Sequence, residues 1–233
     1  MDITRHSTIS DVAANLPATV RVFQQHGIDF CCGGKRPIAE ACTERGLDAE
    51  AILGELRASA ASGRPERNWT DAPLTDLVAH IQARFHAPLR AELPRLAGML
   101  ARVVERHGDR HPEVLLPLHR TFAGLQRELL DHMQKEDAVL FPAIVALEAD
   151  GAGVQSMDWI DQPIEVMEAE HEDAGRALER MRGLTQGYMP PAGACPTFRG
   201  LYYGLAELER EMHLHVHLEN NVLFPRASAL AHR

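Results

Sequence analysis

Two stretches of the chain, HMQKEDAVLFP at 132–142 and HVHLENNVLFP at 215–225, share the pattern H-x-x-x-E-x-x-V-L-F-P. The offset from His132 to His215 is 83 residues, and the other shared positions repeat at the same offset. Because residues four apart lie on one face of a helix, each copy presents an imidazole and a carboxylate to the same side. The repeat therefore predicts two helices with matching His–Glu pairs.

The apolar residues around each copy indicate which face of its helix carries the pair. They recur at alternating steps of three and four, which is typical of a face that points into a helical bundle. In the first copy this seam comprises Phe122, Leu125, Leu129, His132, Glu136 and Val139. In the second copy it comprises Leu201, Leu205, Leu208, Met212, His215, Glu219 and Val222. Both pairs occupy positions where leucine is expected, and we predict that they are buried.

Helical periodicity continues over most of the chain beyond residue 73. Four long segments are expected, at 73–107, 113–148, 161–187 and 196–231, and breaks rich in glycine and proline separate them. Four helices with short connections predict an all-α, up-down-up-down four-helix bundle.

The other two predicted helices each place one histidine on the seam, His86 in the first and His171 in the third. At about 1.5 Å per residue in antiparallel neighbours, these histidines reach the same level as the two His–Glu pairs. Pro88 removes a backbone donor, so a kink beside His86 is expected. Five further histidines are assigned to the surface: His80, His111, His119, His213 and His217.

Six polar groups at one level of an apolar bundle call for a physical explanation. Buried carboxylates and imidazoles are costly unless they are paired or bind metal. Two carboxylates can bridge two cations while two imidazoles complete each of them, and a set without thiolate suits iron or manganese better than structural zinc. We therefore predict a dinuclear metal site with the ligands His86, His132, Glu136, His171, His215 and Glu219.

Bulk properties exclude several classes of function. The net charge of −9 does not favour a nucleic-acid surface. No apolar run reaches the length of a membrane span, and the N-terminus lacks the layout of a signal peptide, so a cytoplasmic location is expected.

The N-terminal part of the chain reads as a separate helical module. We expect a small helical domain at 1–62, a linker at 63–72 and the bundle domain at 73–233. The module contains the loop DFCCGGKRP at 29–37, in which Cys31 and Cys32 are adjacent. A disulfide between neighbouring residues would be strained, so two free thiols are expected.

These motifs resemble those of a known family. H-x-x-x-E on two helices with single histidines on two others is similar to the hemerythrin-like bundles. DFCCGGK ahead of such a bundle resembles the repair-of-iron-centres (RIC) family, the YtfE/ScdA type, over nearly the whole chain. The resemblance implies a cytoplasmic, often dimeric protein with an oxo- or carboxylate-bridged di-iron centre and the same six ligands.

The resemblance further implies a function in repairing iron–sulfur clusters damaged by oxidative or nitrosative stress, with damaged iron–sulfur proteins as partners. It assigns a redox role to Cys31 and Cys32, and the iron is expected to be donated. Two alternatives stay open, and with them whether the protein is an enzyme. One is reduction of nitric oxide at the di-iron centre, and the other is a carrier or sensor that binds nitric oxide or O2.

Overall fold

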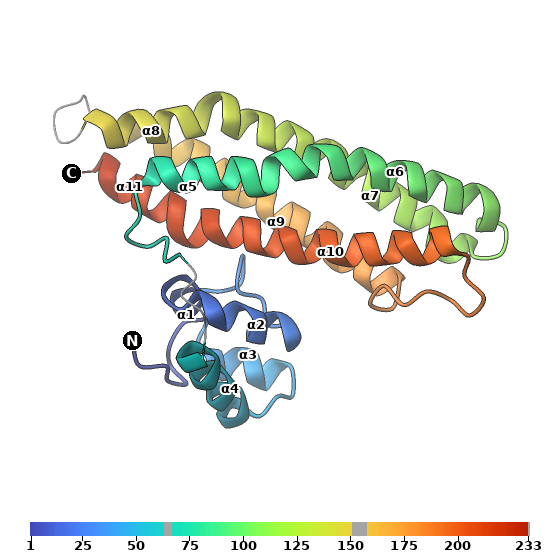
Figure 1. Cartoon of the computed structure of the whole chain (residues 1–233), viewed down its shortest axis with the longest axis horizontal. Helices are drawn as coiled ribbons and strands as arrows, with labels where there is room; N and C mark the ends of the chain where they lie inside the picture. The colour runs from blue at the N-terminus through green and yellow to red at the C-terminus, as the bar shows by residue number, and fades with distance from the viewer. Residues whose placement is uncertain (63–66, 151–157, 233) are drawn as a thin grey trace. The chain divides into compact units, whose positions relative to one another are not determined.

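The computed structural model describes residues 1–62, 67–150 and 158–232, and every regular element in these ranges is a helix (Figure 1). The predicted all-α class is confirmed. The chain forms two compact units, each assembled from separate segments. The first contains Met1–Val78, Ile144–Ile160 and His213–Arg233, and the second contains Ala79–Ala143 and Asp161–Met212.

The N-terminal part of the first unit is a cluster of short helices around its own apolar core. The helices are α1 (Ile9–Asn15), α2 (Val20–Gln25), α3 (Ile38–Glu44) and α4 (Ala49–Ser62), with a 3₁₀ turn at Pro17–Thr19. Gly27 and Gly46 follow α2 and α3 with positive φ angles of 63° and 66°, a conformation that glycine adopts without strain. Phe23, Phe30, Leu53 and Leu56 are almost fully buried in the core.

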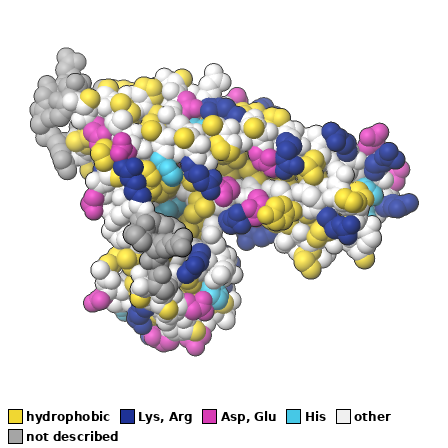
Figure 2. Space-filling model, in the orientation of Figure 1, with side chains coloured by type: hydrophobic (Ala, Val, Ile, Leu, Met, Phe, Trp, Pro, Cys, Tyr) yellow, Lys and Arg dark blue, Asp and Glu magenta, His cyan; other side chains and the backbone are white. Residues whose placement is uncertain are grey.

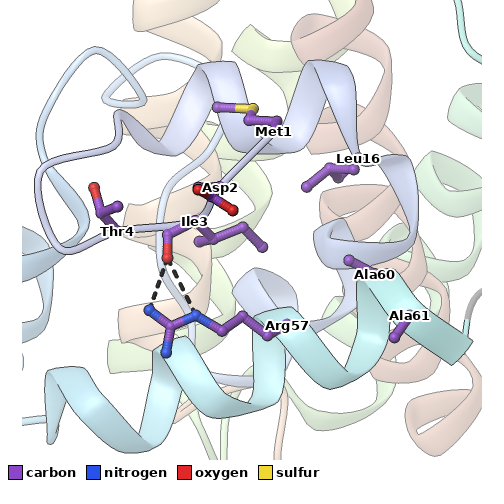
Figure 3. Close-up of a pocket in the computed structure, with 8 residues that line it drawn as sticks. All are labelled: Met1, Asp2, Ile3, Thr4, Leu16, Arg57, Ala60 and Ala61. Atoms are coloured by element: carbon purple, nitrogen blue, oxygen red, sulfur yellow. Dashed lines mark hydrogen bonds between the residues drawn. The ribbon is translucent and has the colours of Figure 1, made fainter.

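The first residues of the chain are held against α4. Arg57 donates two hydrogen bonds to the carbonyl oxygen of Ile3, from Nε at 3.2 Å and from Nη2 at 2.8 Å (Figure 3). Beside this contact lies an open hollow of about 570 Å³. Because its guanidinium is engaged by the backbone, Arg57 ties the N-terminal segment to the domain.

The remainder of the first unit comes from α5 (Leu74–Ile81), α8 (Phe141–Asp150), α11 (Phe224–Ala231) and the last turns of α10 (Pro196–Leu218). The Glu148 carboxylate accepts hydrogen bonds from the backbone N–H groups of Leu74 and Thr75, at 2.6 and 2.8 Å, and so caps α5. Arg226 donates to the carbonyl oxygens of Trp69 and Ala72, at 2.7 and 2.6 Å, and anchors the segment before α5.

The second unit is the body of the four-helix bundle. It contains α6 (Ala87–His107), α7 (Pro112–Lys135), α9 (Asp161–Leu184) and α10 as far as Met212. The helix α7 packs against both α6 and α9. Leu93, Leu96 and Leu100 of α6 are fully buried, as expected for one heptad-like seam. Figure 2 shows positively and negatively charged side chains interspersed on the face in view. Within this unit, Arg84 and Glu211 form an ion pair at 2.6 Å.

Three of the long helices contain a π segment instead of running as continuous α-helices. The segments are Gln82–His86, Glu136–Leu140 and Glu219–Leu223. After each one, a backbone N–H donates to the carbonyl five residues back, from Ala87 to Gln82, from Phe141 to Glu136 and from Phe224 to Glu219. The next residue is always a proline: Pro88, Pro142 or Pro225.

The two copies of the repeat differ in which side chains of their π segments are buried. The expectation that Val139 is buried is wrong: 55% of its surface is exposed, whereas its neighbour Leu140 is 2% exposed. The same expectation for Val222 is confirmed, because this side chain is 2% exposed. Both valines lie in a π segment, so the π turn by itself does not explain the exposure of Val139. The expected disturbance beside His86 takes the form of the π segment that ends at this histidine.

Candidate metal centre

His132 and Glu136 lie at the junction of α7 and its π segment, and both are buried, with exposed fractions of 3% and 0%. His132 Nδ1 lies 2.8 Å from Oε2 of Glu170 on α9. Lys135 forms an ion pair with the other oxygen of Glu170. Burial raises the pKa of Glu170, but the hydrogen bonds from Lys135 and His132 outweigh it and hold that pKa below its usual value.

His86 is oriented in the same way by a different carboxylate. The ring is fully buried, and its Nδ1 lies 3.0 Å from Oδ1 of Asp137. Asp137 accepts a hydrogen bond from Gln82 Nε2 at 2.8 Å and pairs with Arg90. Burial raises the pKa of Asp137, but the hydrogen bonds from Gln82 and Arg90 and the charge of His86 lower it overall.

A carboxylate at Nδ1 favours the imidazole tautomer that carries its proton on that nitrogen, which leaves Nε2 as the possible metal ligand. The Nε2 atoms of His86 and His132 both lie 3.3 Å from Oε2 of Glu136. His171, which is 1% exposed on α9, places its own Nε2 2.9 Å from His132 Nε2. The Nε2 atoms of three histidines and a carboxylate oxygen of Glu136 therefore converge in the interior of the second unit.

Such a group of atoms fits a cation. Ring nitrogens and a carboxylate oxygen this close together are linked by a shared proton or by a metal ion that replaces it. Imidazole nitrogen and carboxylate oxygen suit divalent iron, manganese and zinc, and the described part of this group contains no thiolate. The donors present in the second unit are thus compatible with a bound metal ion.

The second His–Glu pair lies in the first unit, on the last turn of α10 and the start of the π segment Glu219–Leu223. His215 and Glu219 are 1% and 0% exposed, and His215 Nε2 lies 2.9 Å from Oε1 of Glu219. As in the first copy of the repeat, the glutamate is the first residue of a π segment. The structure therefore gives the two copies the same local backbone as well as the same sequence.

The dithiol loop of the first unit is organised by Asp29. Its carboxylate accepts backbone N–H groups from Cys31, Cys32 and Gly33, at 2.9, 3.1 and 2.9 Å. A Cβ at Gly33 would lie 2.8 Å from Asp29 Oδ2, so a larger residue there would force this carboxylate to shift. Burial raises the pKa of Asp29, and the hydrogen bonds from the Cys31 thiol and these N–H groups lower it below its usual value.

Cys31 and Cys32 are thiols that form no disulfide, and Cys31 is buried whereas Cys32 is partly exposed. The hydrogen bond with Cys32, burial and the charge of Asp29 raise the pKa of Cys31 well above its usual value. Cys31 is therefore protonated at neutral pH while the loop is seated as in this structure.

The assignment of His217 to the surface is wrong, because this side chain is 3% exposed. Its Nδ1 lies 3.2 Å from the carbonyl oxygen of Phe30, and burial lowers its pKa to about 4. His119 is exposed as expected, whereas His80, His111 and His213 are partly buried.

Sequence reasoning also missed Asp137 and Glu170, the carboxylates at Nδ1 of two predicted ligands. A signal was present, since Asp137 follows Glu136 directly and Glu170 precedes His171 directly. Acidic residues beside predicted ligands are candidates for such supporting contacts.

Two family models match separate parts of the chain. Residues 5–60 match the model of ScdA_N, described as a domain of unknown function, and residues 77–227 match the hemerythrin HHE cation-binding domain. No helix among the described residues is long and apolar enough to cross a membrane.

Full-length relatives are similar over nearly all of their length. The chain is 38% identical over 223 residues to the iron–sulfur cluster repair protein YtfE of Pectobacterium carotovorum, covering 96% of this chain and 97% of the relative. It is 39% identical over 225 residues to the protein of that name from Citrobacter koseri, covering 97% and 98%. A cation-binding bundle joined to a dithiol module, with identity of this extent, shows that the chain belongs to the YtfE family of hemerythrin-like proteins.

Proposed function

We propose that His86, His132, Glu136, His171, His215 and Glu219 hold two iron ions, with the two glutamates as bridging ligands. Two observations, one from each unit, support this proposal. In the second unit, Nε2 of His86 and Nε2 of His132 each lie 3.3 Å from Oε2 of Glu136, and His171 Nε2 lies 2.9 Å from His132 Nε2. The first unit buries the other copy of the repeat, in which His215 Nε2 lies 2.9 Å from Oε1 of Glu219.

The protein's own residues would prepare this site before any metal binds. Asp137 and Glu170 hold the rings of His86 and His132 so that their Nε2 lone pairs face Glu136. Apolar neighbours exclude water, as shown by the Phe141 ring stacked on His86 with 5.4 Å between the ring centres. When bound, iron supplies redox chemistry and open positions for small ligands.

The function that follows is repair of iron–sulfur clusters damaged by oxidative or nitrosative stress, with the protein as iron donor and damaged iron–sulfur proteins as partners. The observation that carries this proposal is the combination, in one chain, of buried histidine–carboxylate groups with a module that contains two adjacent thiols, Cys31 buried and Cys32 partly exposed. The relatives that match over their full length are named as iron–sulfur cluster repair proteins.

The test begins with metal analysis of anaerobically purified protein, for which we expect two iron ions per chain and spectroscopic coupling between them. Incubation with a cluster protein damaged by nitric oxide should then restore that protein's activity. The Cys31→Ala/Cys32→Ala variant should act more slowly, and a Cys42→Ser variant serves as its control. Equal repair by metal-free protein would refute donation.

Binding or reduction of nitric oxide, or binding of O2, is the second candidate function. Ligands from four histidines and two glutamates leave positions open on each of two iron ions. Anaerobic incubation of the reduced protein with nitric oxide distinguishes the cases. Nitrous oxide formed over many turnovers indicates a reductase, and a stable adduct without gas indicates a carrier or sensor.

The homodimer and the cytoplasmic location stay predictions from the family resemblance. Light scattering of the iron-loaded protein should give twice the mass of 25.8 kDa for a dimer. Fractionation of the source cells should place the protein with cytoplasmic markers.

A further inference from the structure

One segment of the chain contacts the dithiol loop and also supplies two of the proposed metal ligands. Along residues 215–221, the proposed ligands His215 and Glu219 alternate with His217 and Asn221. All four belong to the first unit, as does the loop that contains Cys31 and Cys32. The contacts of His217 and Asn221 therefore indicate how the dithiol loop and the proposed metal site are linked.

Asn221 binds the backbone of the dithiol loop directly. Its Nδ2 donates to the carbonyl oxygens of Phe30 and Cys31, both at 3.1 Å. The same atom lies 3.0 Å from Nδ1 of His217, which is itself 3.2 Å from the Phe30 carbonyl. Two side chains one helical turn apart thus contact two consecutive backbone carbonyl groups, those of Phe30 and Cys31.

The Phe30 side chain also packs against the residues that bind the loop backbone. Its ring lies edge-on to the rings of His217 and His213, with centre-to-centre distances of 5.4 and 6.2 Å. Leu214 packs against the apolar core of the N-terminal helices, to which Phe30 belongs. The contact buries Phe30 to 1% exposure and His217 to 3%, so the loop is docked by packing as well as by hydrogen bonds.

The π segment that contains Asn221 begins at Glu219, which is also a proposed metal ligand. Asn221 lies inside the π segment Glu219–Leu223, which the N–H of Phe224 closes onto the carbonyl of Glu219. A π turn is a rare conformation that usually needs support from its surroundings. A metal ion bound by His215 and Glu219 would supply such support, because it fixes both side chains at the start of the segment.

We propose that His217 and Asn221 are positioning residues that couple metal occupancy to the seating of the dithiol loop. With iron bound, the π segment is fixed and the loop is held with Cys31 buried. When iron leaves, the π segment relaxes and the hydrogen bonds from Asn221 to the Phe30 and Cys31 carbonyls weaken. The thiols of Cys31 and Cys32 then become more accessible. This inference rests on the proposed metal site and adds to it a means by which iron release exposes the dithiol.

The test measures alkylation of Cys31 and Cys32 in a Cys42→Ser/Cys195→Ser background, anaerobically, with and without ferrous iron. We expect the iron-free protein to react about fivefold faster, the factor that corresponds to one ordinary hydrogen bond. In Asn221→Ala and Asn221→Asp, the thiols should react fast with and without iron. The ratio of the iron-free to the iron-loaded alkylation rate should therefore approach one. Asn220→Ala, which changes the neighbouring residue in the same way, should keep the parental ratio.

Iron content is measured in every sample, which separates this inference from the proposed function. Protein that binds no iron overturns both. Iron that binds stoichiometrically without changing the alkylation rate overturns the coupling alone. A ratio in Asn221→Ala equal to that of the parent also overturns it, because the hydrogen bonds from Asn221 would then have only a static structural role.

Discussion

At the scale of single residues, the site depends on carboxylates that are not among the proposed metal ligands. Asp137 and Glu170 each contact Nδ1 of one histidine, and each is paired with a cationic side chain at the surface, Arg90 or Lys135. The cation keeps the carboxylate charged, and the carboxylate fixes both the tautomer and the angle of the ring. The histidine is therefore ready to bind metal without reorganising.

We expect Asp137→Asn and Glu170→Gln each to weaken iron binding by about 10- to 100-fold, the usual effect of losing such a supporting contact. An amide at either position can rotate its NH₂ toward the ring and favour the wrong tautomer. Competition with a chelator measures the affinity, and thermal unfolding of the iron-free protein should change little. Asp173→Asn is the control, because Asp173 lies on α9 in an exposed pair with Arg176.

Unchanged affinity in both variants would mean that the packing around His86 and His132 suffices to orient them. If only one variant loses affinity, the two halves of the site are not equally dependent on their supporting carboxylates. The comparison thus assigns the contribution of each carboxylate separately.

At the scale of elements, helical periodicity predicted the four long segments to within a few residues but not their π segments. The apolar pattern around His132 and His215 is regular enough to fix the buried face. The additional residue of a π turn leaves no periodic trace in the sequence. The repeat also predicted the same burial for Val139 and Val222, although only Val222 is buried. His217 was misassigned for another reason: Phe30, its partner, lies 187 positions away in the sequence.

Pro142 and Pro225, which follow the π segments of the two repeat copies, influence the backbone conformation there. Proline has no N–H, so at Pro142 and Pro225 an α-helix would gain no hydrogen bond over the π turn. Proline alone does not create such a turn, since Pro94 and Pro117 lie inside α-helices. We infer that Pro142 and Pro225 lower the cost of a π conformation that the site around Glu136 and Glu219 requires.

Pro142→Ala and Pro225→Ala should therefore have opposite effects on two properties. The free energy of unfolding of the iron-free protein should stay the same or rise by up to about 3 kcal/mol, because the α-helical alternative regains a donor. Iron binding should weaken by about tenfold, because the glutamate at the start of the segment shifts. Denaturant unfolding and chelator competition measure the two.

Pro94→Ala and Pro117→Ala serve as the matched substitutions, for which we expect higher stability and unchanged iron affinity. Should all four variants bind iron equally well, the prolines would have no part in positioning the ligands. A loss of both stability and affinity at Pro142 would instead indicate simple damage to packing.

At the scale of the whole molecule, the two compact units divide the helix α10 between them. Its first part, up to Met212, belongs to the bundle body, and its last turn belongs with the N-terminal helices. The sequence predicted the module, the linker and the bundle as successive domains at 1–62, 63–72 and 73–233, and these boundaries stay a prediction. Local patterns do not reveal that residues 213–223 pack with a core built from the start of the chain.

Hydrogen exchange of two phenylalanine variants tests this division. Phe30 and Phe198 are both 1% exposed. In the first unit, Phe30 contacts His217 of α10, and in the second unit Phe198, which lies in the first turn of α10, contacts His107 of α6. Replacing a buried phenylalanine by alanine costs about 3–5 kcal/mol of stability. Because local opening follows cooperative units, the loss of protection should be confined to the unit that contains the substitution.

In Phe30→Ala we expect faster exchange in α1–α4 and in residues 213–223, with α6 and α7 unchanged. In Phe198→Ala we expect faster exchange at the start of α10 and the end of α6, with the N-terminal helices unchanged. Iron loading should slow exchange at 213–223 in the parent protein, since the metal fixes His215 and Glu219. Exchange that rises uniformly along the chain in both variants would show that the protein opens as a single cooperative unit, and the end of α10 would then have no separate link to the dithiol module.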